Sequence, residues 1–69
     1  MAISYKKLWK LLIDKNMIKK DLRIAAGLST NVIAKLGKNE NVSTEVLGKI
    51  WFVLDCEITD IMEFVDEDK

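Results

Sequence analysis

The sequence contains no proline, no histidine and one cysteine among its 69 residues. Without histidine, neither the usual zinc-ligand sets nor the Ser-His and Cys-His nucleophile pairs can be assembled. The residues therefore predict no metal site, no cofactor and no enzyme, and no small-molecule ligand is evident. No apolar run approaches the roughly 20 residues that a membrane helix needs, and no leader peptide is recognisable. We expect a cytoplasmic protein with no membrane partner.

The charge is strongly polarised along the chain although it sums to zero. Residues 1–38 carry nine Lys and Arg against two acids, a net charge of +7, and residues 39–69 carry two lysines against nine acids, a net charge of −7. Such asymmetry favours one basic and one acidic face, and a phosphate backbone could dock on the basic face. Charge alone leaves a second interpretation open, in which two solvated helix faces of opposite sign attract each other.

Apolar periodicity and capping residues predict an all-α fold, a single domain over residues 1–69. Since glycine occurs only three times and proline never, helices are favoured, and their ends have to be read from caps. Ser4, Ser29 and Ser43 are the expected N-caps of the first, third and fourth helices, and Gly27 is the expected C-cap of the second. The predicted helices cover residues 5–15, 19–26, 29–37, 43–54 and 58–64.

Two of these helices are short and are joined by about three residues that contain Gly27, which is typical of a helix-turn-helix. The helix over 43–54 is apolar around most of its circumference, so we expect most of it to be buried. Trp51 is assigned to the core in preference to an interface, whereas Phe52 fits a core position or an interface position equally well. Cys56 is interpreted as a small buried apolar residue. The other residues assigned to the core are Leu22, Val32, Ile33, Leu36, Leu47, Ile50 and Leu54.

The stretch KKDLRIAAGLSTNVIAKL, residues 19–36, resembles the helix-turn-helix of the phage Cro and repressor proteins and of their bacterial relatives, the XRE family. Residues 42–50 and 54–62 look like that family's fourth and fifth helices, so the resemblance covers nearly the whole chain. It implies a compact five-helix, lambda-repressor-like domain, similar to a stand-alone bacterial subgroup of very small regulators. The chain departs from the family pattern at Arg23, where alanine is common, at Gly37, where glutamate is frequent, and at Asn39, where glycine is frequent.

The resemblance also implies how the domain meets double-stranded DNA. In the family the third helix lies in the major groove, and the second helix points its N-terminus at a phosphate. Carried over by position, the candidates for base contacts are Thr30, Asn31 and Lys35, of which Asn31 suits adenine and Lys35 suits guanine. The candidates for phosphate contacts are Lys19, Lys20, Arg23, Lys38, Asn39 and Asn41. For any one of these lysines, solubility alone is an equally good explanation.

Two functions remain open at this point. The first is sequence-specific DNA binding by a repressor-like transcriptional regulator of bacterial or phage origin, acting as a homodimer whose interface uses Trp51, Phe52 and Phe64. The second is a protein-interaction module, an antitoxin or an anti-repressor, that binds its partner through the apolar C-terminal helices. The first function requires the basic surface of the second and third helices, whereas the second would survive charge reversal at Lys19 and Lys35.

Overall fold

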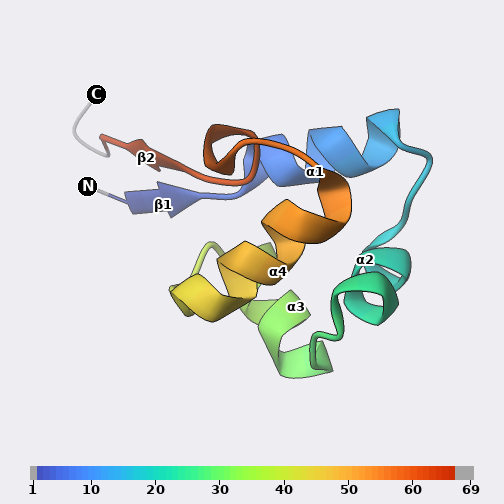
Figure 1. Cartoon of the computed structure of the whole chain (residues 1–69). Coiled ribbons are helices and arrows are strands. Elements are labelled where there is room, and N and C mark those ends of the chain that lie inside the picture. The colour runs from blue at the N-terminus through green and yellow to red at the C-terminus, as the bar shows by residue number, and fades with distance from the viewer. Residues whose placement is uncertain (1, 67–69) are drawn as a thin grey trace.

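The computed structural model describes residues 2–66, and these form four α-helices, one 3-10 helix and a two-stranded sheet (Figure 1). The α-helices are α1 (Lys6–Asp14), α2 (Lys19–Ala26), α3 (Thr30–Gly37) and α4 (Thr44–Leu54). The 3-10 helix η1 (Ile58–Asp60) follows α4, and the strands are β1 (Ala2–Ser4) and β2 (Glu63–Val65). The first four predicted helices are confirmed to within one residue at each end. In this part of the chain no helix has the length and apolar character needed to span a bilayer.

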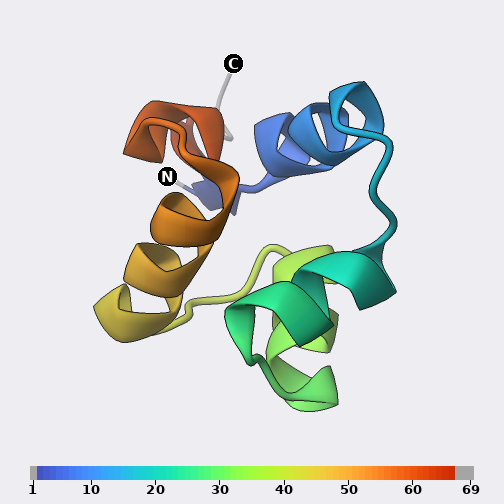
Figure 2. The same ribbon diagram turned by 45° about the vertical axis from the view of Figure 1, so that its right-hand side comes forward.

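The predicted fifth helix over 58–64 is wrong, and the described chain is mostly helical rather than all-α. Only Ile58–Asp60 forms a helical turn, of the 3-10 type, and Glu63–Val65 is extended. Strand β2 pairs antiparallel with β1, with Phe64 opposite Ile3, so the two ends of the described chain meet beside α1 (Figures 1 and 2). The apolar spacing of this segment fits either a helix or a strand. The choice depends on pairing with a segment about sixty residues away, which no local pattern reveals.

Serine side chains fix the starts of α3 and α4, as predicted. Ser29 Oγ accepts a hydrogen bond from the backbone N–H of Val32, and Ser43 Oγ accepts one from the N–H of Val46, each at 3.2 Å. Each bond satisfies one of the N–H groups that the first turn of a helix leaves without an intrahelical partner. The expected cap of α1 is shifted by one residue, because its N-cap position is occupied by Tyr5 rather than by Ser4.

The turn between α2 and α3 depends on the left-handed backbone of Gly27. Its φ is 65°, and the N–H of the next residue, Leu28, bonds back to the carbonyl of Arg23 at 2.8 Å. A Cβ added to Gly27 would meet no atom within 4 Å, so the glycine is required by its φ and not by lack of space. This turn sets the path of the chain from α2 into α3 and so the angle at which the two helices cross.

One core holds the helices and the end of the chain together. Of the residues predicted to be buried, Leu22, Leu36, Ile50 and Leu54 are, whereas Val32, Ile33 and Leu47 are partly buried around them. The sequence analysis did not assign Ile61 to the core, yet it is fully buried and anchors the segment between η1 and β2. Within residues 2–66 the buried core residues are Tyr5, Leu8, Leu12, Leu22, Ala26, Leu28, Leu36, Ile50, Leu54 and Ile61.

Asn39 ties the loop after α3 to the start of α1. Its backbone is left-handed, with a φ of 58°, and its Oδ1 accepts a hydrogen bond from the N–H of Tyr5 at 3.0 Å. The hydroxyl of Tyr5 in turn donates to the carbonyl oxygen of Glu40 at 2.8 Å, and the tyrosine side chain is almost fully buried. These two bonds fix the end of α3 relative to α1. They also account for a tyrosine at the first turn of the chain's first helix.

Burial raises the pKa of Tyr5 above its ordinary value of 10.0, and donation to the Glu40 carbonyl favours the same protonated form. In the unfolded chain the Tyr5 phenol ionises near its ordinary pKa. In the folded protein it therefore keeps its proton over the pH range just above that pKa. Stability is therefore complete below about pH 10 and is lost as the pH rises through the folded pKa. Tyr5 is the only tyrosine, so phenolate absorbance reports it alone. Tyr5 should titrate at higher pH in the folded protein than in the urea-unfolded chain. Coincident titration curves would contradict the burial argument.

Candidate nucleic-acid interface

The outward face of α3 carries all three residues predicted to contact bases. Because successive residues of a helix are rotated by about 100°, Thr30, Asn31 and Lys35 fall within an arc of about 140°. All three are exposed, whereas Leu36 on the other side of the helix is fully buried. Helix α3 lies at one edge of the domain (Figures 1 and 2), and Lys35 near its end lines an open hollow with residues of the sheet. The structure therefore brings these residues together on one exposed face of the helix.

Ala34 belongs to the same face, and the sequence analysis did not name it. It falls between Thr30 and Asn31 around the helix axis and is exposed. A side chain this small lets the helix backbone approach a base-pair edge closely, and its methyl group can contact a thymine methyl. The helical period that groups Thr30, Asn31 and Lys35 would have identified Ala34 as well.

The start of α2 offers backbone N–H groups and two lysines. Its N-cap residue is Ile18, which makes no side-chain cap, in contrast to the serines that begin α3 and α4. Asp21 reaches back and accepts a hydrogen bond from the N–H of Ile18 at 2.9 Å. Lys19 and Lys20 occupy the first turn, where the helix dipole is positive and a cation is disfavoured. Their charges therefore do not stabilise α2 through its dipole, whereas an anion at this end would be favoured by both the amides and the ammonium groups.

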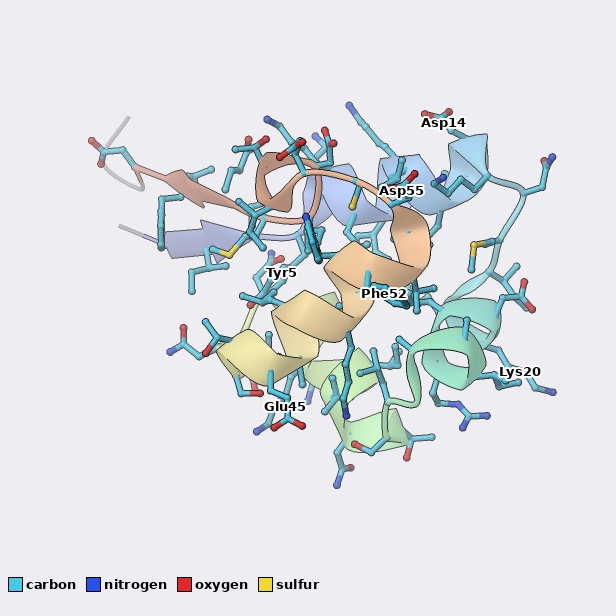
Figure 3. All side chains as sticks on the ribbon, viewed as in Figure 1. Tyr5, Asp14, Lys20, Glu45, Phe52 and Asp55 are labelled. Carbon is cyan, nitrogen blue, oxygen red and sulfur yellow. The ribbon has the colours of Figure 1, made fainter. Side chains whose placement is uncertain are left out.

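We refer to Lys19, Lys20, Arg23, Lys35 and Lys38 as the basic surface. None of them forms an ion pair with another residue of the described range 2–66, whereas Lys7 bonds to Glu63 at 3.1 Å and Lys49 to Glu45 at 3.7 Å. Figure 3 shows Lys20 extending from α2 away from the body of the domain, with Asp14 and Asp55 higher in the view, near α1 and the end of α4. Arg23 is half-buried and the other four are exposed. A phosphate could bind these cations without breaking an internal ion pair.

Asn39 and Asn41 follow α3 and complete the set predicted to contact phosphate. The N–H of Asn39 donates to the carbonyl of Leu36 at 3.2 Å, and its Oδ1 is engaged by Tyr5. The side-chain NH₂ is the donor that Asn39 can still offer to a phosphate. Asn41 is exposed and lines an open hollow together with Lys35 and other residues.

Two aromatic residues of α4 lie on the surface, so the expectation that α4 is mostly buried is wrong. The helix buries Ile50 and Leu54 against the core, but Trp51 is 50% and Phe52 79% exposed. Figure 3 shows where Phe52 lies on α4. Phe64, the third residue predicted for a dimer interface, is 62% exposed on β2, a different element.

Cys56 is partly buried against the core, close to its expected role as a small apolar residue. Burial raises the pKa of its thiol, and the negative charges of Asp60, Glu57 and Asp55 raise it further, against a smaller opposing effect of Lys15. Little thiolate forms at neutral pH, which disfavours a redox role.

Comparison with known proteins agrees with this geometry. The family model of the Cro/C1-type helix-turn-helix DNA-binding domain matches residues 7–67, which include α2, α3 and α4. A crystal structure of the transcriptional regulator VanUg, form II, is similar to this chain with a TM-score of 0.92 and 55% sequence identity, over 96% of this chain and 88% of that one. The comparison with curated proteins gives no match. The chain belongs to the family of Cro/C1-type helix-turn-helix DNA-binding domains.

Proposed function

We propose that this protein regulates transcription by binding a specific double-stranded DNA sequence with α3 in the major groove. The observation that carries the proposal is the outward face of α3, on which Thr30, Asn31 and Lys35 are exposed together beside the unpaired cations of the basic surface. The family match supports DNA binding, and the name of the similar protein VanUg, a transcriptional regulator, supports the regulatory role.

The three polar residues of α3 would read base edges in different ways. The amide of Asn31 can both accept from and donate to adenine, and the ammonium of Lys35 can donate to O6 and N7 of guanine. Thr30 offers a hydroxyl and a methyl group, so it can bond to a base or pack against thymine. Each good contact of this kind discriminates against a wrong base by about 1–3 kcal/mol.

The phosphate contacts would hold α3 in the groove from both of its ends. Lys19, Lys20 and Arg23 precede α3 in the chain, and Lys38, Asn39 and Asn41 follow it. Contacts before and after the recognition helix fix its register without reading sequence. If the three lysines and the arginine of this set all meet phosphates, the logarithm of the binding constant should fall with the logarithm of the salt concentration with a slope of about −3 to −4.

The test is fluorescence anisotropy of the purified protein with a pool of random-sequence duplexes, from low to physiological salt. We expect binding that weakens log-linearly with salt, and rounds of selection from the pool should enrich one site. Absence of binding at low salt would contradict the proposal. It would favour the protein-interaction module instead, with the partner bound on the side of Trp51 and Phe52.

The exposed side of α4 supports a second proposal, that the protein acts as a homodimer. Gly48 precedes Trp51 and Phe52 by about one turn and is exposed, and a Cβ added there would meet no atom within 4 Å. Packing inside the domain therefore does not require this glycine, which costs about 1 kcal/mol relative to alanine inside a helix. A glycine flanked by exposed aromatic residues would let the α4 helix of a second copy approach closely. A two-fold pair would then present two α3 helices to one duplex.

Sedimentation velocity of the wild type and of Phe52→Glu tests the homodimer. The wild type should associate as its concentration rises, and the variant should remain monomeric with an unchanged circular dichroism spectrum, because Phe52 contributes little to the core. A wild type that stays monomeric both alone and on its selected duplex would contradict the homodimer. If the protein is instead an antitoxin or anti-repressor that uses this surface, we expect a monomer on its own. Binding of its partner should then survive charge reversal at Lys19 and Lys35.

A further inference from the structure

Lys19 differs from a freely solvated lysine because its ammonium lies against an aromatic ring. Its Nζ is over the indole of Trp9, 4.5 Å from the ring centroid, within the range of a cation–π interaction. Trp9 belongs to α1 and is partly buried against the core, and Lys19 is the first residue of α2. The ring is therefore held by the core, and it can in turn hold the cation.

The end of α3 approaches the same ammonium. Lys19 Nζ lies 3.8 Å from the position that a Cβ of Gly37 would occupy, and Gly37 is the last residue of α3. The carbonyl groups at a helix C-terminus carry partial negative charge, which favours a cation there. The ammonium of Lys19 thus lies where α1, the start of α2 and the end of α3 meet.

None of these neighbours occupies the hydrogen-bond donors of Lys19. Its side chain makes no ion pair or hydrogen bond with any other residue in the part of the chain that the structure describes. The ring face attracts the charge but accepts no conventional hydrogen bond, and an ammonium has three N–H donors. Lys19 and Trp9 line one shallow apolar groove with Ile13 and Ile18, along which the lysine stem can lie. The ammonium is therefore positioned and still able to donate.

We propose that Trp9 is a positioning residue for DNA binding, which holds the Lys19 ammonium at its phosphate contact before DNA arrives. A long side chain loses rotamer freedom when it is fixed in a complex, and a side chain already fixed in the free protein loses less. Affinity would then depend on Trp9 although the indole touches no phosphate. This inference rests on the proposed function, because it needs Lys19 to contact the DNA backbone.

A double-mutant cycle on the affinity for the selected duplex tests this role. Trp9→Leu should weaken binding about two- to five-fold in the wild-type background and leave it unchanged in the Lys19→Gln background. Lys19→Gln should also reduce the salt slope by about 1, whereas Trp9→Leu should leave the slope unchanged because the charge is still there. Trp9→Phe keeps an aromatic face and should restore part of the affinity. All variants are compared well below their thermal unfolding midpoints.

Lys20 provides the matched control, because it is a lysine of the same helical turn without a ring beneath it. The effects of Trp9→Leu and Lys20→Gln should therefore add. If Trp9→Leu weakens binding equally in the wild-type and Lys19→Gln backgrounds, its effect is structural and the inference is overturned. If Lys19→Gln changes neither affinity nor slope in a protein that binds DNA, Lys19 meets no phosphate and the inference again fails, while the proposed function stands. A wild type that binds no duplex would overturn the proposed function itself.

The contact can also be checked without DNA. The chain has two tryptophans, so in Trp51→Phe the emission reports Trp9 alone. Adding Lys19→Gln to that protein removes the cation over the ring and should shift the emission, whereas Lys20→Gln should not. Equal emission from all three proteins would overturn the positioning of Lys19 by Trp9.

Discussion

Replacing Lys35 by glutamate should lower the affinity for the selected duplex by about ten- to a hundred-fold, which is the range expected for the loss of one direct base contact. Lys35 is exposed on the outward face of α3, on the same side as Thr30 and Asn31. The substitution removes the donor that would meet a guanine and brings a carboxylate to a groove bordered by phosphates. Because the side chain contributes nothing to the buried core, the variant should still fold, with a small loss of stability from a negative charge in the last turn of α3. Anisotropy with the wild-type duplex measures the loss.

Lys7→Glu is the matched control, since it changes the net charge by the same amount. Lys7 bonds to Glu63 of β2 and lines a groove with Asp60 of η1 and residues of α1, none of which belongs to α2 or α3. The ion pair is exposed and contributes about 0–1 kcal/mol. At physiological salt charges are screened over about 8 Å, so a carboxylate outside the α3 face and the basic surface should change the affinity less than one on α3. Equal losses in the two variants would mean that binding follows net charge and not the α3 face.

The helix-turn-helix could be predicted closely because its determinants are local. The Ser29 and Ser43 caps each bond to an N–H three residues later, and the left-handed Gly27 ends α2 by a bond to a residue of the same helix. Such interactions can be read from residue type and spacing alone. The same period that separates the buried Leu36 from the exposed Lys35 also groups the candidate base contacts on one face.

The C-terminal segment could not be predicted in this way because its structure depends on a distant partner. Phe64 faces Ile3 across an antiparallel pair, and Lys7 of α1 bonds to Glu63 of the same strand. Neither contact can be predicted from the spacing of apolar residues within the segment. Phe52, for which the sequence left core and interface both open, is exposed, and Trp51, which was expected in the core, is half-exposed.

The candidate site could be predicted as a set of residues but not as a set of contacts. The placement of Lys19 over Trp9 requires α1 and α2 to meet at one particular angle, and the bond from Tyr5 to Asn39 joins residues 34 positions apart. The sequence shows only that Asn39 tolerates a left-handed backbone better than most residues do. That its Oδ1 is already engaged, which leaves the NH₂ group for a phosphate, follows from the tertiary structure alone.

Replacing Asn39 by alanine should lower the free energy of unfolding by about 2–5 kcal/mol, from two separable causes. A left-handed backbone at a residue with an ordinary Cβ costs roughly 1–2 kcal/mol, and Asn39 has a φ of 58°. Loss of Oδ1 also leaves the N–H of Tyr5 without its acceptor, and a polar group left unsatisfied on burial costs about 1–3 kcal/mol. Urea unfolding measures the change, which should appear in the midpoint with an unchanged m-value.

Asn39→Gly and Asn39→Asp separate the two causes. Glycine adopts the left-handed backbone without strain but cannot accept from Tyr5, so its loss should be smaller than that of alanine. Aspartate keeps an acceptor oxygen in the same place and should remain nearest to the wild type, with a small penalty for a negative charge at the end of α3. The expected order of stability is therefore alanine, glycine, aspartate and asparagine, from lowest to highest. Glycine is frequent at this position in the family that the sequence resembles. If the Asn39→Gly variant proves more stable than the wild type, the bond to Tyr5 does not stabilise the fold. The bond would then serve only to orient the end of α3.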